Sequence, residues 1–101
     1  MELIRDLVSS NPLDRERSAD RSTDWASVYS EVDGKMLAAV LSVCAASESN
    51  HSALEAQLNA LLALGAGGFT DGKTLERLRA IDRDSAPGPL REYLDDLLEG
   101  A

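Results

Sequence analysis

The sequence predicts an all-α domain of about six helices. Apolar residues recur at the three- and four-residue spacing of helices along almost the whole chain, and no segment keeps the two-residue alternation of a half-buried strand. Short polar or glycine-rich breaks separate the apolar stripes and mark the connections between helices. With 101 residues, the chain fits a single helical domain over residues 1–101.

Two helices are predicted before residue 30. The first carries an apolar stripe that ends at Leu7 and Val8. Asn11 followed by Pro12 has the sequence of an N-cap with proline at the first helical position, so a second helix begins there. We expect this helix to run to about Tyr29 with Trp25 in the core, and one side of it is formed by Ala19, Ser22, Trp25, Ala26 and Tyr29.

A third helix is predicted from Ser30, which resembles a capping box with Asp33. One long helix through this junction is the alternative. The predicted inward side is Val32, Met36, Leu37, Val40, Leu41, Val43 and Cys44. The predicted outer side is also weakly polar, which indicates a helix covered on more than one side. It consists of Ala38, Ser42, Ala45 and Ala46.

Three more helices are predicted after residue 50. Ser52 and Glu55 form a capping box for the fourth, which ends at a glycine cluster. Thr70 or Asp71 caps a short fifth helix, and a loop over 84–89 precedes the sixth. The inward residues of these helices are Leu54, Leu58, Leu61, Leu62, Leu75, Leu78, Ile81, Leu90, Leu94, Leu97 and Leu98.

Charge is distributed unevenly along the predicted helices. Between Met36 and Gly72 there is no Lys or Arg, whereas the helices at the two ends of the chain hold most of the charged residues. This pattern predicts three antiparallel helical hairpins stacked in chain order, with a covered central pair and polar terminal pairs.

The segment SNPLDRERSAD carries a family resemblance. Asn11 and Pro12 stand in a turn, and Arg17 and Ala19 lie close to the positions of the Arg and Ala that follow this turn in HEAT-type repeats. The N-terminal part of the chain therefore resembles a degenerate HEAT repeat, which implies a HEAT-like α-solenoid or helical bundle. The pattern departs from the family at residues 15–16, where a valine and an arginine are usual.

The C-terminal half carries a second resemblance. The segments LEAQLNALLALGAGG, TLERLRAID and LREYLDDLLEG are similar to small helical proteins encoded beside bacterial secreted toxins. The resemblance implies an immunity protein, an antitoxin that binds a cognate polymorphic-toxin domain and blocks it without enzymatic activity of its own. A non-enzymatic scaffold or adaptor subunit of a larger bacterial complex is the alternative.

Acidic rows on two helices supply the candidate partner-binding residues. One row has the spacing of a single face of the sixth helix, and the other continues from Glu16 along the second. On one side of a helical stack, the two rows would attract a basic protein, such as a toxin that acts on nucleic acid. The alternative is a solvated surface. The residues are Asp20, Asp24, Glu92, Asp95, Asp96 and Glu99.

Composition argues against several other partners. A net charge of −8, from 10 Lys and Arg against 18 Asp and Glu, disfavours nucleic acid and anionic lipid. One Cys and one His make neither a disulfide nor a conventional zinc site. The N-terminus is unlike a signal peptide, and the longest weakly charged stretch, 36–47, is too short to cross a bilayer. We therefore expect a cytoplasmic protein without metal or cofactor.

Catalytic chemistry is not predicted. Cys44 lies on an apolar helix face, and His51 lies in a polar loop without a nucleophile and carboxylate arranged around it. Residues 67–74 satisfy the spacing G-x-x-x-x-G-K-T, but a leucine-rich helix precedes them where a phosphate loop needs a strand. A nucleotide-responsive regulator is a third alternative.

Overall fold

The computed structural model describes residues 2–99, and none of these is in a β-strand. The prediction of an all-α fold with six α-helices is therefore confirmed for this part of the chain. In chain order the elements are α1 (Glu2–Leu7), α2 (Pro12–Asp24), the 3₁₀ turn η1 (Ala26–Val28), α3 (Glu31–Ser47), α4 (His51–Ala66), α5 (Gly72–Leu78) and α6 (Gly88–Glu99).

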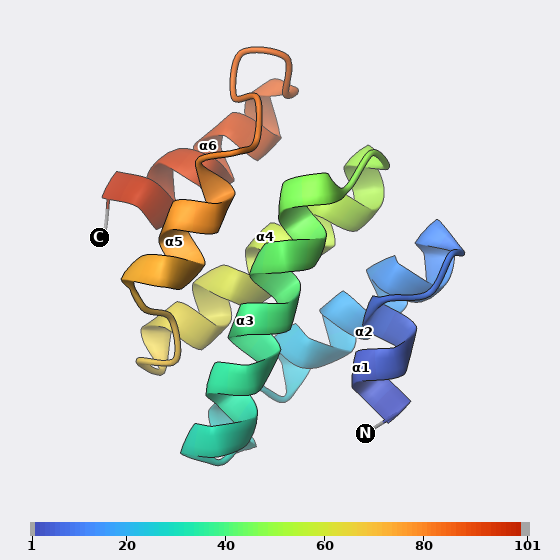
Figure 1. Cartoon of the computed structure of the whole chain (residues 1–101), viewed down its shortest axis with the longest axis vertical. Helices are drawn as coiled ribbons and strands as arrows, with labels where there is room; N and C mark the ends of the chain where they lie inside the picture. Colours follow the sequence, from blue (N-terminus) through green and yellow to red (C-terminus); the bar gives the residue numbers. More distant parts are fainter. Residues whose placement is uncertain (1, 100–101) are drawn as a thin grey trace.

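The helices form two layers (Figure 1). In the layer nearer the viewer, α3 lies between α1 and α5 and packs against both; in the layer behind, α4 lies between α2 and α6 and packs against both. Across the layers α1 packs on α2, α3 on α4 and α5 on α6. The molecule measures 34 × 30 × 19 Å, so the two layers present two broad faces separated by the shortest axis.

Side-chain caps fix where four of the helices begin. The side chains of Asn11, Ser30, Asn50 and Asp71 accept a backbone N–H from the first turn of α2, α3, α4 and α5. The predicted caps at Asn11 and Ser30 are confirmed, so α2 and α3 are separate helices. The capping box predicted at Ser52 is wrong, because Asn50 caps α4 two residues earlier.

The predicted end of the second helix is also wrong. Helix α2 ends at Asp24, and η1 carries the chain to the next cap. Ala19 and Ser22 are buried as expected, but Trp25 is 56% exposed rather than part of the core. Once α2 stops, the helical periodicity that placed Trp25 on its inward side no longer applies.

Helix α3 turns a different side to the core than predicted. Ala38, Ser42 and Ala45, expected outside, are buried, while Val32, Met36 and Val43, expected inside, are exposed. Leu37 and Leu41 are buried as predicted. The small residues of the inward side let α3 pack closely on its neighbours, and a Cβ on the buried Gly34 would lie 2.5 Å from the ring of Phe69.

Helix α4 is the centre of the core. Its leucines and the alanines between them are buried, including Ala53, Leu58, Ala60 and Leu61, because α2, α3 and α6 all pack against it. The predicted covering of this helix on more than one side is confirmed, although Leu62 is only partly buried. Gly68, at φ +83°, supplies the left-handed residue that turns the chain after α4.

Candidate protein-binding surface

Negative charge is concentrated on the layer formed by α2, α4 and α6. These helices carry a formal charge of −5. Helix α2 has four carboxylates and three guanidinium groups, α4 has one carboxylate, and α6 has four carboxylates and one guanidinium group. Five carboxylates against four cationic side chains leave α1, α3 and α5 at −1. The two broad faces therefore differ in the electrostatic field that they present to a partner. We call the outer side of α2, α4 and α6 the acidic face.

A groove on the acidic face brings three of its helices together. Its volume is about 260 Å³, and its walls are Glu16 and Asp20 of α2, Glu55 and Asn59 of α4, and Tyr93 of α6, with Ser52 and Ala56 completing it. Among these lining residues there is no Lys or Arg. The groove can therefore accept the cationic end of a Lys or Arg side chain, with the Tyr93 ring as an apolar wall.

The candidate residues of α6 occupy different surroundings. Glu92 is exposed, and Asp96 is exposed in a shallow depression where α6 meets α4 and α5, beside Leu62 and Leu75. Asp95 instead forms a bidentate ion pair with Arg83, which lies in the connection before α6. Arg83 donates from Nε to Oδ1 and from Nη2 to Oδ2 of Asp95, both at 2.7 Å. The Arg83 hydrogen bonds lower the pKa of Asp95 below its ordinary value.

The predicted acidic rows are thus joined only in part. Asp20 lies in the groove that Tyr93 of α6 also lines, and Asp24 lies outside that groove at the exposed end of α2. The side chain of Glu99 lies outside the described residues. Sequence reasoning did not include Glu55 in the site, although its spacing from Ser52 and Asn59 marks the polar stripe of a helix that is otherwise mostly apolar.

A second polar cluster is structural. Arg15 of α2 forms a bidentate ion pair with Glu48, which lies in the turn between α3 and α4. The two hydrogen bonds measure 2.7 and 2.8 Å. The Glu48 side chain is 2% exposed and also accepts hydrogen bonds from the backbone N–H of Asn50 and from Nε2 of Gln57. Arg15 also donates to the carbonyl of Ser9 at 2.8 Å. The pair therefore fastens the α1–α2 turn to the α3–α4 turn.

Acid is expected to weaken this cluster. Burial raises the pKa of Glu48, but the hydrogen bonds from Arg15, Asn50 and Gln57 outweigh it and hold the pKa below its ordinary value. A carboxylate with a lowered folded-state pKa stabilises the fold above the unfolded pKa and loses that contribution as the pH falls through the folded pKa. We therefore expect the melting temperature of the wild type to fall more steeply than that of Glu48→Gln between pH 5 and about pH 3. Thermal melts followed by circular dichroism measure this. Parallel curves for the two proteins would contradict it.

The structure places Cys44 and residues 67–74, which were weighed above for catalysis and phosphate binding, as follows. Cys44 is half-buried, its Sγ lies 3.6 Å from the carbonyl of Leu7, and burial raises the pKa of its thiol. Residues 67–71 connect the end of α4 to the start of α5, and residues 72–74 form the first turn of α5, so a helix leads into the segment 67–74. Among the described residues, no three His, Cys, Asp or Glu side chains are grouped as metal ligands.

Within residues 2–99, no helix has the length and apolar character needed to span a membrane. Compared with known proteins, the chain matches no family model, no curated protein and no solved structure.

Proposed function

We propose that the protein is a non-enzymatic binding module whose acidic face docks on a basic protein domain. In its most concrete form it is an immunity protein: it covers the cationic cleft of a cognate bacterial toxin and blocks it by occlusion. The proposal includes a HEAT-like arrangement of three helical hairpins, which is supported by α1, α3 and α5 following one another in one layer and α2, α4 and α6 in the other.

The observation that carries the proposal is the charge difference between the two layers. The formal charge of −5 on α2, α4 and α6 lies on one side of a molecule only 19 Å thick, and that side also holds the acidic groove. Such a field speeds and orients the encounter with a basic partner. A solvated surface needs negative charge, but it does not need the charge gathered on one face.

The acidic residues have separate roles in this binding. Asp20 and Glu55 take a cationic side chain into the groove, where exclusion of water strengthens the contact. Glu92 and Asp96 extend the field along α6 toward the rim. Asp95 contributes less to the field than predicted from the sequence, because Arg83 already neutralises it.

A pair of charge reversals tests the proposal. Asp20→Lys/Asp96→Lys changes the acidic face, and Glu31→Lys/Glu76→Lys makes the same change in net charge at exposed positions of α3 and α5. We expect the first variant to capture at least tenfold less of a basic protein from native lysate than the wild type does, because each reversal replaces an attraction with a repulsion. The second variant should retain capture.

The captured protein is identified by mass spectrometry and eluted with a salt gradient. A basic partner released by salt, retained by the control variant and lost by the acidic-face variant supports the proposal. Equal loss in both variants would show nonspecific charge attraction, and full capture by the acidic-face variant would place the binding surface elsewhere; either result overturns it. Circular dichroism of both variants, which should match the helical spectrum of the wild type, is the control for folding.

A further inference from the structure

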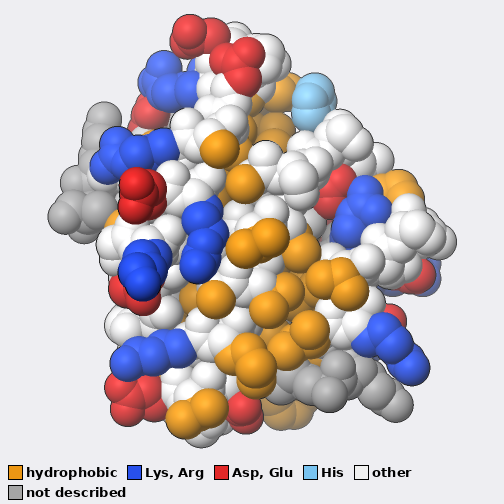
Figure 2. Space-filling model, in the orientation of Figure 1, with side chains coloured by type: hydrophobic (Ala, Val, Ile, Leu, Met, Phe, Trp, Pro, Cys, Tyr) orange, Lys and Arg blue, Asp and Glu red, His pale blue; other side chains and the backbone are white. Residues whose placement is uncertain are grey.

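The layer opposite the acidic face exposes an apolar stripe. Val32, Met36 and Val43 lie along the outer side of α3 and are 74%, 41% and 56% exposed, with Ala39 and Val40 half-buried between them. At the end of α3, Val43 and the exposed Val8 line a common groove of about 380 Å³. Figure 2 shows apolar side chains gathered over α3 and toward α1. We call Val8, Val32, Met36 and Val43 the α3 stripe.

The α3 stripe is not explained by the fold. Single exposed apolar residues are normal, but several large ones aligned on one helix leave a continuous surface that water solvates poorly. Small residues such as Ala38 and Ala45 of the same helix face inward, so the larger side chains are held outside by the packing of α3 on its neighbours. A surface of this kind is characteristic of a protein–protein interface.

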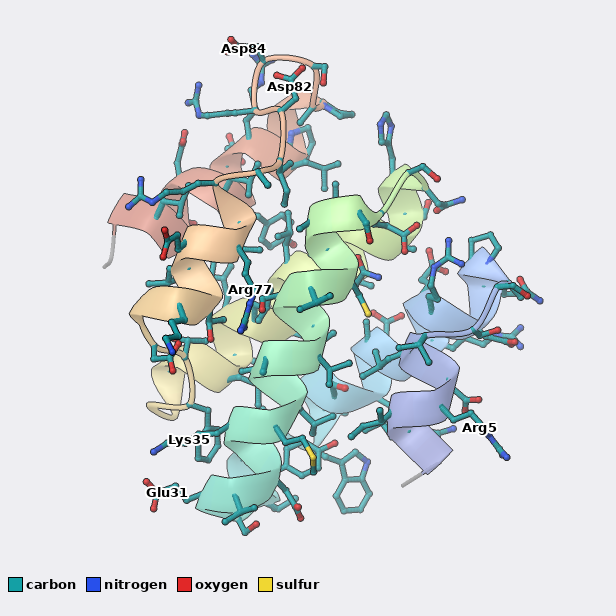
Figure 3. All side chains as sticks on the ribbon, viewed as in Figure 1. Arg5, Glu31, Lys35, Arg77, Asp82 and Asp84 are labelled. Carbon is teal, nitrogen blue, oxygen red and sulfur yellow. The ribbon has the colours of Figure 1, made fainter. Side chains whose placement is uncertain are left out.

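Charge indicates which partner fits the stripe. Each chain carries −8, so two copies repel one another at most relative orientations, and most strongly through their acidic faces. The helices α1, α3 and α5 carry a formal charge of only −1, and the cations beside the stripe include Lys35, which pairs with Glu31 of the same helix. Figure 3 shows Lys35 near the start of α3 and Arg77 reaching from α5 toward α3, where its Nη1 donates to the Ser42 hydroxyl at 3.2 Å. This is the face at which a second copy meets the least repulsion.

The size of the face is also sufficient. A standard stable interface buries about 800 Å² on each partner, and a contact that covers most of a broad face, which measures 34 × 30 Å, would reach this size. Apolar groups lie toward both ends of α3, Val32 near the start and Val43 near the end, so a two-fold axis crossing the middle of the helix brings apolar surface onto apolar surface. Surfaces that are complementary to themselves are what a symmetric dimer requires.

We propose that the α3 stripe is a self-association surface on which two copies of this chain pair face to face. The acidic faces then point outward on both sides, and the dimer offers two of them. This inference does not depend on the identity, or the existence, of a basic partner. It predicts a monomer–dimer equilibrium in the purified protein.

Sedimentation equilibrium from micromolar to millimolar concentration measures that equilibrium. We expect the wild type to approach twice its monomer mass, and Met36→Lys/Val43→Lys to dissociate at least tenfold more readily because four ammonium groups, two from each copy, would have to be buried in the contact. The matched control is Asp20→Asn/Asp96→Asn, which makes the same change in net charge, +2, on the acidic face and should dimerise at least as well as the wild type. Val32→Lys is a further variant, at the most exposed position of the stripe.

Salt gives an independent readout. Molar sodium chloride screens the repulsion between copies that each carry −8, so it should strengthen an apolar self-association. The same salt should weaken capture of a basic protein by the acidic face. A wild type that stays monomeric at millimolar concentration in high salt would overturn the inference. So would folded stripe variants that dimerise as tightly as the wild type. Neither result would affect the proposed binding by the acidic face.

Discussion

Replacing Arg15 with alanine is expected to lower the melting temperature by roughly 10–20 °C. The Glu48 carboxylate, 2% exposed, would lose two charge-assisted hydrogen bonds and remain in the interior without a cation. Breaking one side of a buried pair is far more costly than the pair is worth in net stability, because the remaining charge is desolvated and uncompensated. The turns on both sides of the cluster lose their connection at the same time.

Thermal melts of the folded protein measure this effect, and the exposed pair supplies the control. Lys35 bonds Glu31 at 2.8 Å, but both side chains are more than half exposed, so Lys35→Ala should shift the melting temperature by no more than a few degrees. Glu48→Gln added to Arg15→Ala should recover part of the loss, since it removes the uncompensated charge and keeps an oxygen for the Asn50 N–H. Equal shifts for Arg15→Ala and Lys35→Ala would show that the buried pair does not stabilise the fold.

Local signals in the sequence predicted the helices well. Asn11 with Pro12 and Ser30 with Asp33 specify caps that depend only on residues within one turn, and the glycines after α4 specify its end. The cap of α4 was misplaced because Asn50 and Ser52 both have suitable side chains, and only the position of the chain after Ser47 decides between them. Local propensity does not distinguish the two positions.

The orientation of α3 could not be predicted for the same reason. The apolar residues of this helix are distributed all round its axis, so its sequence has no clearly polar side that must face water. The inward side is set by the neighbours: α1, α4 and α5 pack against α3, and its small residues Ala38, Ser42 and Ala45 are buried. The larger Val32 and Met36 are left outside. The same orientation of α3 therefore buries its small residues and exposes the larger ones of the stripe.

In the candidate site, too, local spacing predicted which helix carries each residue, but not the tertiary contacts that the residue makes. Helical spacing correctly placed Glu92, Asp95 and Asp96 on α6, and alternation of layers brought α2 and α6 to one face through α4. The pairing of Asp95 with Arg83 could not be foreseen, because Arg83 lies in an irregular connection whose path no periodicity specifies. Glu55 entered the groove because α4 lies between α2 and α6, which is a property of the tertiary arrangement.

The orientation of α3 leads to the second large prediction, a comparison of two substitutions two residues apart. Leu41→Ala is expected to lower the free energy of unfolding by about 2–5 kcal/mol, because Leu41 is fully buried and its loss leaves a cavity. Val43→Ala should change it by less than about 0.5 kcal/mol, since Val43 is 56% exposed. Urea unfolding at micromolar concentration, where self-association is minimal, measures both.

The sequence pattern alone places both residues on the inward side of α3, and therefore predicts large losses for both. The structure separates them, because a step of two residues turns the side chain through more than half of a helical turn, from the packed side to the stripe. A large loss for Val43→Ala at low concentration would mean that the stripe faces the core of a single chain. That result would restore the orientation expected from the sequence and remove the surface on which the proposed dimer depends.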